Sequence, residues 1–91
     1  MTNSNFTSQL KKFKELHPDA IFLMRKEDAY EIYNEDARKA APVLGFTPQP
    51  AIGGLDYVLR FPVHHLDIAL PRLVRAGFRI AIVEHPEDWQ Q

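Results

Sequence analysis

Two neighbouring cations, Arg25 and Lys26, follow the apolar residues 20–24, and three lysines lie upstream of that apolar segment. Ammonium and guanidinium groups bind the phosphates of a nucleic acid backbone. If the end of the lysine-rich segment lies next to Arg25 and Lys26 in the folded chain, these groups form a phosphate-contacting patch. The alternative, which we favour slightly, is ordinary solvated charge. The candidate cations are Arg25, Lys26, Lys11, Lys12 and Lys14.

A second set of arginines could also cluster, because part of it lies in a predicted helix. The alternative is again ordinary surface charge. Its members are Arg60, Arg72, Arg75 and Arg79.

The histidine pair His64 and His65, together with Asp67, Glu84 and His85, suggests a metal site. Adjacent side chains on an extended segment point to opposite faces, however, and a zinc site needs ligands that converge. We therefore expect a turn or core histidine there, and no metal or other cofactor.

Several classes of chemistry find no support in the residue types. The chain has no cysteine, so it has no disulfide, no thiolate zinc site and no cysteine nucleophile. It also lacks a phosphate-binding loop of the GxxxxGK[ST] type and any evident Ser-His-Asp spacing. We therefore predict that the chain is not an enzyme.

Composition indicates one ordinary globular domain. The 91 residues carry 45% hydrophobic and 25% charged side chains, with a net charge of −1. The electrostatic field of a nearly neutral chain does not attract nucleic acid by itself, so any DNA affinity must come from a local patch of charge. There is no apolar run of about 20 residues and no signal peptide, so we expect no membrane contact and a cytoplasmic protein. We expect residues 1–5 and 86–91 to be tails.

The first half of the chain reads as a helix followed by two strands. Apolar residues recur at three- and four-residue spacing over residues 7–16, and Pro18 ends that helix. Residues 20–24 are continuously apolar, as in a central strand. A charged turn at residues 25–27 then leads into a strand over residues 28–33.

A second helix is predicted to begin at Asn34, which can cap it, with acids in its first turn. Pro42 should end or kink this helix, and Gly45 should close it. The following residues 46–56 are rich in proline and glycine, so we expect a loop with one short edge strand.

The second half repeats the alternation. Residues 57–61 read as a strand, Asp67 can cap a helix over residues 68–76, and Gly77 can end it. Residues 79–83 are typical of a buried strand. These patterns are compatible with an α/β fold.

The stretch Arg25-Lys26-Glu27-Asp28-Ala29-Tyr30-Glu31 resembles the Arg-x-Gly-Asp-Phe-Tyr-Glu motif of MutS domain I, the opening domain of the MutS mismatch-repair proteins. Residues 61–65, 70–77 and 80–84 also resemble segments of that domain, in the same order. The similarity covers residues ~10–85. It implies a mixed β-sheet with about three flanking helices.

The resemblance also implies roles for single residues. In the family, the Phe of the motif wedges into the base stack, and the Glu two residues later hydrogen-bonds the displaced base. Here Ala29 stands at the Phe position, Glu27 at the Gly position and Glu31 at the Glu position. Alanine is too small to unstack bases, and Tyr30 points to the other face of the strand. We favour Tyr30 as packing and Glu31 as a surface carboxylate over mismatch reading.

Two functions remain open. The first is a DNA-associated module that contacts the DNA backbone, with Glu31 as an added candidate, and that works beside a larger DNA-processing protein. The second is a protein–protein interaction domain that reuses the fold, through a sheet edge, residues 46–55 or Trp89. The oligomeric state stays open.

Overall fold

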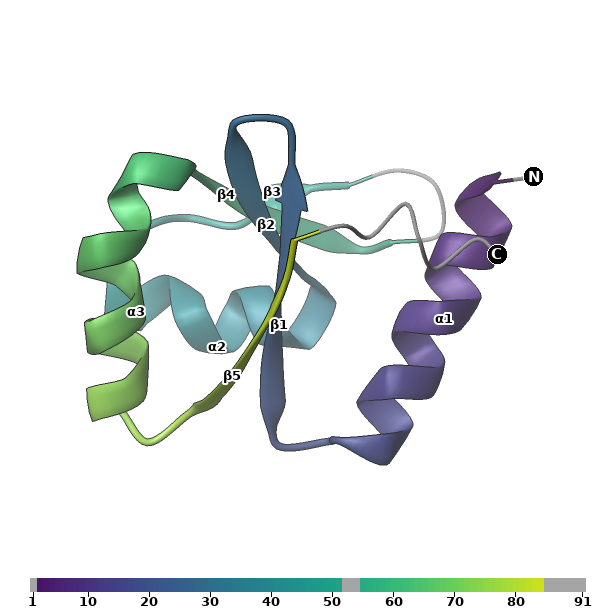
Figure 1. Cartoon of the computed structure of the whole chain (residues 1–91), viewed down its shortest axis with the longest axis horizontal. Helices are drawn as coiled ribbons and strands as arrows, with labels where there is room; N and C mark the ends of the chain where they lie inside the picture. The colour runs from purple at the N-terminus through teal and green to yellow at the C-terminus, as the bar shows by residue number, and fades with distance from the viewer. Residues whose placement is uncertain (1, 52–54, 85–91) are drawn as a thin grey trace.

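A five-stranded mixed sheet forms the centre of the molecule, in the order β3-β4-β2-β1-β5. The computed structural model describes residues 2–51 and 55–84, with side chains from residue 8 onward. β1 pairs in parallel with β5 and antiparallel with β2, and β4 is antiparallel to both β2 and β3. The α/β prediction is thus confirmed (Figure 1). The strands are β1 (Ala20–Lys26), β2 (Ala29–Tyr33), β3 (Gln49–Pro50), β4 (Tyr57–Pro62) and β5 (Arg79–Val83).

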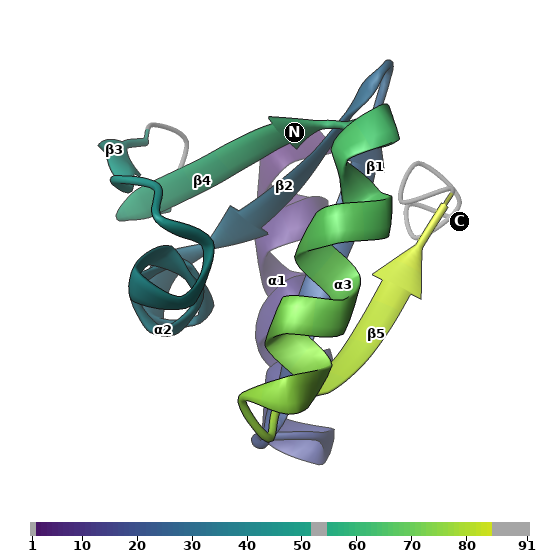
Figure 2. The same cartoon turned by 90° about the vertical axis from the view of Figure 1, so that its left-hand side faces the viewer.

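Helices cover both faces of the sheet, because side chains alternate along each strand. Ile21 and Leu23 of β1 face α2 and α3, whereas Phe22 and Met24 face α1. Figure 2 shows α1 behind the sheet, with α2 and α3 on the near side. The helices are α1 (Thr2–Leu16), α2 (Asn34–Leu44) and α3 (Leu66–Arg75), and a short 3-10 turn, η1 (Val63–His65), precedes α3.

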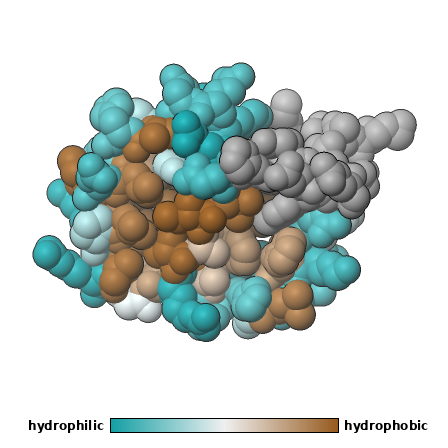
Figure 3. All heavy atoms as spheres, viewed as in Figure 1, coloured by the Kyte–Doolittle hydropathy of each residue, from teal (hydrophilic) through white to brown (hydrophobic). Residues whose placement is uncertain are grey.

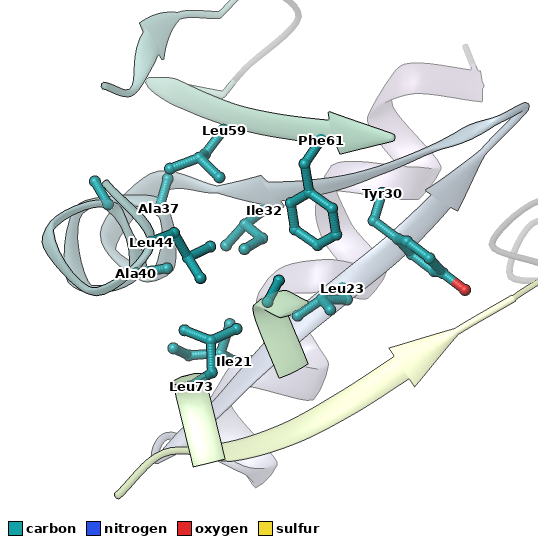
Figure 4. Packing of buried hydrophobic residues seen from close by; sticks show 12 residues of the cluster. Ile21, Leu23, Tyr30, Ile32, Ala37, Ala40, Leu44, Leu59, Phe61 and Leu73 are labelled. Atoms are coloured by element: carbon teal, nitrogen blue, oxygen red, sulfur yellow. The ribbon is translucent and has the colours of Figure 1, made fainter. Parts of the chain in front are cut away.

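The larger core cluster lies between the sheet and the α2–α3 layer (Figure 4). Strand side chains such as Ile32 and Phe61 meet the small residues of α2, which let that helix approach the sheet closely. The fully buried residues of this cluster include Leu23, Ile32, Leu59, Phe61, Ala37, Ala40, Ala69 and Leu73.

Several elements differ from the sequence-based expectation. α3 begins at Leu66, so Asp67 lies in its first turn and does not cap it. α1 begins at Thr2 rather than near residue 7, so it takes in part of the segment expected as a tail. Residues 86–91 lie outside the described residues. β5 spans the predicted residues 79–83, but it is an edge strand whose residues are exposed or half-buried, so the prediction of a buried strand is wrong.

Asn34 was predicted to cap α2, but its side chain instead fixes the loop before β4. Its backbone is left-handed, with φ of 57°. Its side-chain oxygen accepts the backbone N–H of Asp56 at 2.7 Å and that of Tyr57 at 3.4 Å. The local signal for a cap is therefore overridden by a contact with a distant loop. α2 continues through Pro42, and Gly45 closes it with φ of 75°, as expected.

Candidate nucleic-acid interface

The β1–β2 hairpin carries the cations that the sequence singled out. β1 runs on through Lys26, which pairs with Ala29, so the turn consists of Glu27 and Asp28 rather than residues 25–27. Lys26, Glu27 and Asp28 are exposed. Figure 1 shows this hairpin projecting beyond the rest of the sheet. Its tip therefore offers one exposed ammonium beside two exposed carboxylates.

The Arg25 side chain is held in place by the carboxylate of Glu84, the residue that follows β5. Its Nε donates to the carbonyl oxygen of Glu27 at 2.7 Å, and its Nη1 donates to Glu84 Oε1 at 3.1 Å. The Tyr30 hydroxyl donates to the other oxygen of Glu84 at 2.7 Å. Burial, followed by this carboxylate, raises the pKa of Tyr30. Glu84 thus offsets much of the charge that Arg25 could present to a phosphate.

The residue at the wedge position is not presented to solvent. Ala29 is 4% exposed, and the next residue, Tyr30, is 2% exposed. The Tyr30 ring packs against Phe61 with a centroid distance of 5.9 Å, as expected for a core residue (Figure 4). The hairpin therefore has no exposed aromatic side chain at residue 29 or 30 that could enter a base stack.

Glu31 is buried, which corrects its interpretation as a surface carboxylate. It is 8% exposed and accepts the Tyr33 hydroxyl at 2.6 Å. The guanidinium of Arg60 lies 3.7 Å from its other oxygen. Burial first, and then this carboxylate, raise the pKa of Tyr33. In this arrangement Glu31 links β2 to β4.

The Lys14 ammonium group is also bound within the molecule. Its Nζ lies 2.8 Å from Asp36 Oδ1 and 2.5 Å from the carbonyl oxygen of Ala20. β1 pairs with β2 only from Met24 onward, so the amide of Phe22 has no ladder partner on that side. Asp36 Oδ2 accepts that amide at 3.3 Å. The Lys14–Asp36 pair therefore closes the gap where the two strands separate, which sequence patterns did not indicate.

Lys14 and the hairpin cations do not form one patch. Lys14 contacts the first residue of β1, whereas Arg25 and Lys26 are its last two residues. A strand rises about 3.3 Å per residue, so five residues separate these ends by roughly 17 Å. Lys11 and Lys12 are exposed, and neither has a carboxylate partner among the described residues. Both belong to α1.

The second arginine set is dispersed as well. Arg60 lies on β4 beside Glu31, on the face that α1 covers, whereas Arg72 and Arg75 belong to α3 on the opposite face. Arg79 begins β5 and bonds Asp19 at 3.2 Å, which lowers the pKa of that carboxyl group. These four residues therefore do not form a single phosphate-binding surface.

The histidine pair has a structural environment. His65 packs against Phe46 and Phe61, with ring-centroid distances of 5.5 and 5.9 Å. No group of three His, Asp or Glu residues within the described ranges could hold a metal ion, and His85 lies outside them. His65 therefore contributes to the packing around η1.

No helix in the described part of the chain is long and apolar enough to cross a membrane.

Comparison with known proteins places these features in a family. A family model described as MutS domain I matches residues 4–91. The DNA mismatch repair protein MutS of Phocaeicola vulgatus is 47% identical over 88 residues, covering 90% of this chain and 10% of the relative. MutS of Porphyromonas gingivalis is 48% identical over 80 residues, covering 85% and 9%. The MutS of Salinibacter ruber is 45% identical over 83 residues, covering 88% and 9%. The chain thus spans about a tenth of the length of these relatives.

Proposed function

The chain belongs to the MutS domain I family, and we propose that it is a non-catalytic module that contacts the DNA backbone without reading mismatches. The observation that carries this proposal is the contrast within the hairpin, where Lys26 is exposed and Ala29 is 4% exposed. A cation can reach a phosphate there, while no side chain at residue 29 can enter the base stack. We further propose a cytoplasmic location and a larger DNA-processing protein as partner.

The proposed contact is electrostatic and weak. Lys26 supplies a full exposed charge, whereas Arg25 is partly offset by Glu84 at 3.1 Å. The exposed acids Glu27 and Asp28 repel phosphates at the same tip. Non-specific binding of this kind has dissociation constants of about 10⁻⁴–10⁻⁶ M and weakens steeply with salt. We expect this module to bind at the weak end of that range.

Mismatch reading needs two side chains that this hairpin does not offer. Unstacking a base step costs a few kcal/mol, and only the contacts of a large apolar side chain can offset that cost. A carboxylate that reads a displaced base must also be free to turn toward it. Glu31 is instead bound to the Tyr33 hydroxyl at 2.6 Å and lies beside Arg60. We therefore expect equal affinity for paired and mispaired duplexes.

The test is a fluorescence-anisotropy titration of labelled duplex DNA at two salt concentrations, with matched lysine variants. We expect Lys26→Ala to weaken binding severalfold and to lower the salt slope by about one unit. The control Lys39→Ala removes an exposed lysine of α2 and should leave affinity unchanged. Equal affinities for the wild type and Lys26→Ala would refute the hairpin as the contact.

The exposed Lys11 and Lys12 form a second proposed phosphate contact. Their joint replacement by alanine should lower the salt slope by up to about two units if both reach the backbone. An unchanged slope would confine the contact to the hairpin.

One observation favours a second candidate, a protein-interaction domain. The hairpin tip places two exposed carboxylates beside its one exposed lysine, so its charge does not favour phosphate. β5 meanwhile leaves an apolar strand at the edge of the sheet. Binding of the chain to a partner protein, with no DNA binding even at low salt, would support this candidate over the first.

A further inference from the structure

Apolar side chains gather on the surface formed by α3 and β5 (Figure 3). On β5, Ile82 is 39% exposed and Ile80, two residues before it on the same face, is half-buried. On α3, Val74 is 55% exposed, and Leu70 lies one turn before it on the same side of the helix. α3 packs directly against β5. Exposed apolar surface shared by two elements is typical of an interaction site.

The outer edge of β5 has no partner strand among the described residues. An edge strand presents unpaired N–H and C=O groups, and proteins usually protect such edges with lysine, proline, a bulge or a very short strand. β3, at the opposite edge, is protected in this way, because it spans only Gln49–Pro50 and contains a proline. β5 has no charged residue or proline between Arg79 and Glu84. Within residues 2–51 and 55–84, nothing pairs with this edge, so it is available there for strand addition.

Charge is unevenly distributed along this edge. Arg75 ends α3 and has no carboxylate partner among the described residues. Arg79 begins β5, and its side chain is 71% exposed despite its bond to Asp19. Asp19 offsets part of the Arg79 charge, so the net positive charge at the end where β5 begins comes mainly from Arg75. A carboxylate on a bound segment would be favoured there.

We propose that the outer edge of β5 binds an extended segment of another protein by strand addition. Backbone hydrogen bonds would join the segment to β5, and its alternate apolar side chains would cover Ile80, Ile82 and the adjacent side of α3. Carboxylates of the segment would lie beside Arg75 and Arg79. This proposal rests on the protein-interaction candidate and is independent of DNA contact at the hairpin.

The probe is a fluorescein-labelled peptide of seven alternating valines and threonines, with two aspartates at its amino end or, in a second version, at its carboxyl end. We expect saturable anisotropy in the micromolar range for one of the two versions. Methylating the peptide amides that face β5 should weaken binding at least about tenfold, whereas methylating the other alternate set should not.

The matched protein variants are Ile82→Lys and Leu16→Lys. Ile82→Lys places a charge on the edge strand and should weaken binding at least about tenfold. Leu16 is 64% exposed at the end of α1, which packs on the opposite face of the sheet from Ile80 and Ile82, so its replacement should not change binding. Circular dichroism and the melting temperature check that both variants fold. DNA titrations of Ile82→Lys should match those of the wild type.

Three results would overturn the proposal. The first is peptide binding that neither pattern of methylation nor Ile82→Lys weakens, which would indicate unspecific apolar contact. The second is the absence of saturable binding for both peptides. The third is a wild-type dimer in sedimentation analysis that Ile82→Lys converts to a monomer, because the edge would then be occupied by a second copy of this chain.

Discussion

Replacing Glu27 with glycine should stabilise the protein through the geometry of the β1–β2 turn. Glu27 has φ of 58°, in the left-handed region that non-glycine residues seldom adopt. It stands where the MutS domain I motif has glycine. No hydrogen bond or ion pair uses its carboxylate among the described residues. Arg25 Nε binds its backbone carbonyl, which glycine also provides.

The expected gain is a difference between two terms. A non-glycine residue in the left-handed conformation costs about 1–2 kcal/mol, which glycine removes. Glycine also increases the conformational entropy of the unfolded chain, which costs about 0.5–1 kcal/mol. The net stabilisation of Glu27→Gly is therefore about 0.5–1 kcal/mol. For a domain of this size, that raises the melting temperature by roughly 2–8 °C.

Urea unfolding followed by circular dichroism measures this change directly. The matched control is Asp28→Gly, because Asp28 is the other turn residue and has no positive φ. At residue 28, glycine brings only its entropic cost, so the free energy of unfolding of Asp28→Gly should fall by about 0.5–1 kcal/mol. If both variants change the free energy of unfolding in the same direction, the strain assigned to Glu27 is refuted.

Lys14→Met should lower the free energy of unfolding, measured in urea, by about 2 kcal/mol, because it leaves the buried Asp36 carboxylate without its cation. Adding Asp36→Asn to this variant should recover part of the loss. Failure of the double variant to recover stability would contradict the pairing. The raised pKa values of Tyr30 and Tyr33 mean that the unfolded chain ionises first, so stability should hold below pH 10 and fall above it. Melting temperatures between pH 8 and 11 test this, and Tyr33→Phe should flatten the fall. Ala29→Phe should destabilise the fold by about 1–3 kcal/mol through overpacking at a 4% exposed site, and a neutral effect would show that the site has room.

Local patterns predicted most of the secondary structure. The apolar run that starts at Ala20 and the alternation around Ile32 predicted β1 and β2, because strand periodicity is a property of a few adjacent residues. Gly45 ends α2 with the expected left-handed φ of 75°. Residues 79–83 form a strand with the predicted bounds. Its exposure could not be predicted, because strand order decides which strand lies at an edge.

The polar network of the site depends on contacts between distant residues. Lys14 and Asp36 lie 22 positions apart and meet where β1 and β2 separate, between Met24 and the start of β1 at Ala20. Glu31 was expected at the surface, since a lone carboxylate in a strand usually faces solvent. Its carboxylate instead accepts the Tyr33 hydroxyl and lies 3.7 Å from Arg60, a neighbour supplied by the β2–β4 register. No local pattern encodes such pairings, and the resemblance to MutS domain I did not indicate them.

The length of β1 separates Lys14 from the hairpin cations, which were candidates for one shared patch. Lys14 and Arg25 are each bound to a carboxylate, whereas Lys26 is exposed without one among the described residues. The candidate surface therefore depends mainly on one lysine at the hairpin tip. This explains why we expect weak binding with a low salt slope.

The most direct test of the central claim compares matched and G·T-mismatched duplexes of one sequence in anisotropy titrations at two salt concentrations. We expect salt-sensitive binding with dissociation constants that agree within about twofold for the two duplexes. A preference of about tenfold or more for the mismatch would contradict it, because a side chain other than that of Ala29 would then enter the base stack. The absence of binding to either duplex at low salt would contradict the proposed DNA contact itself.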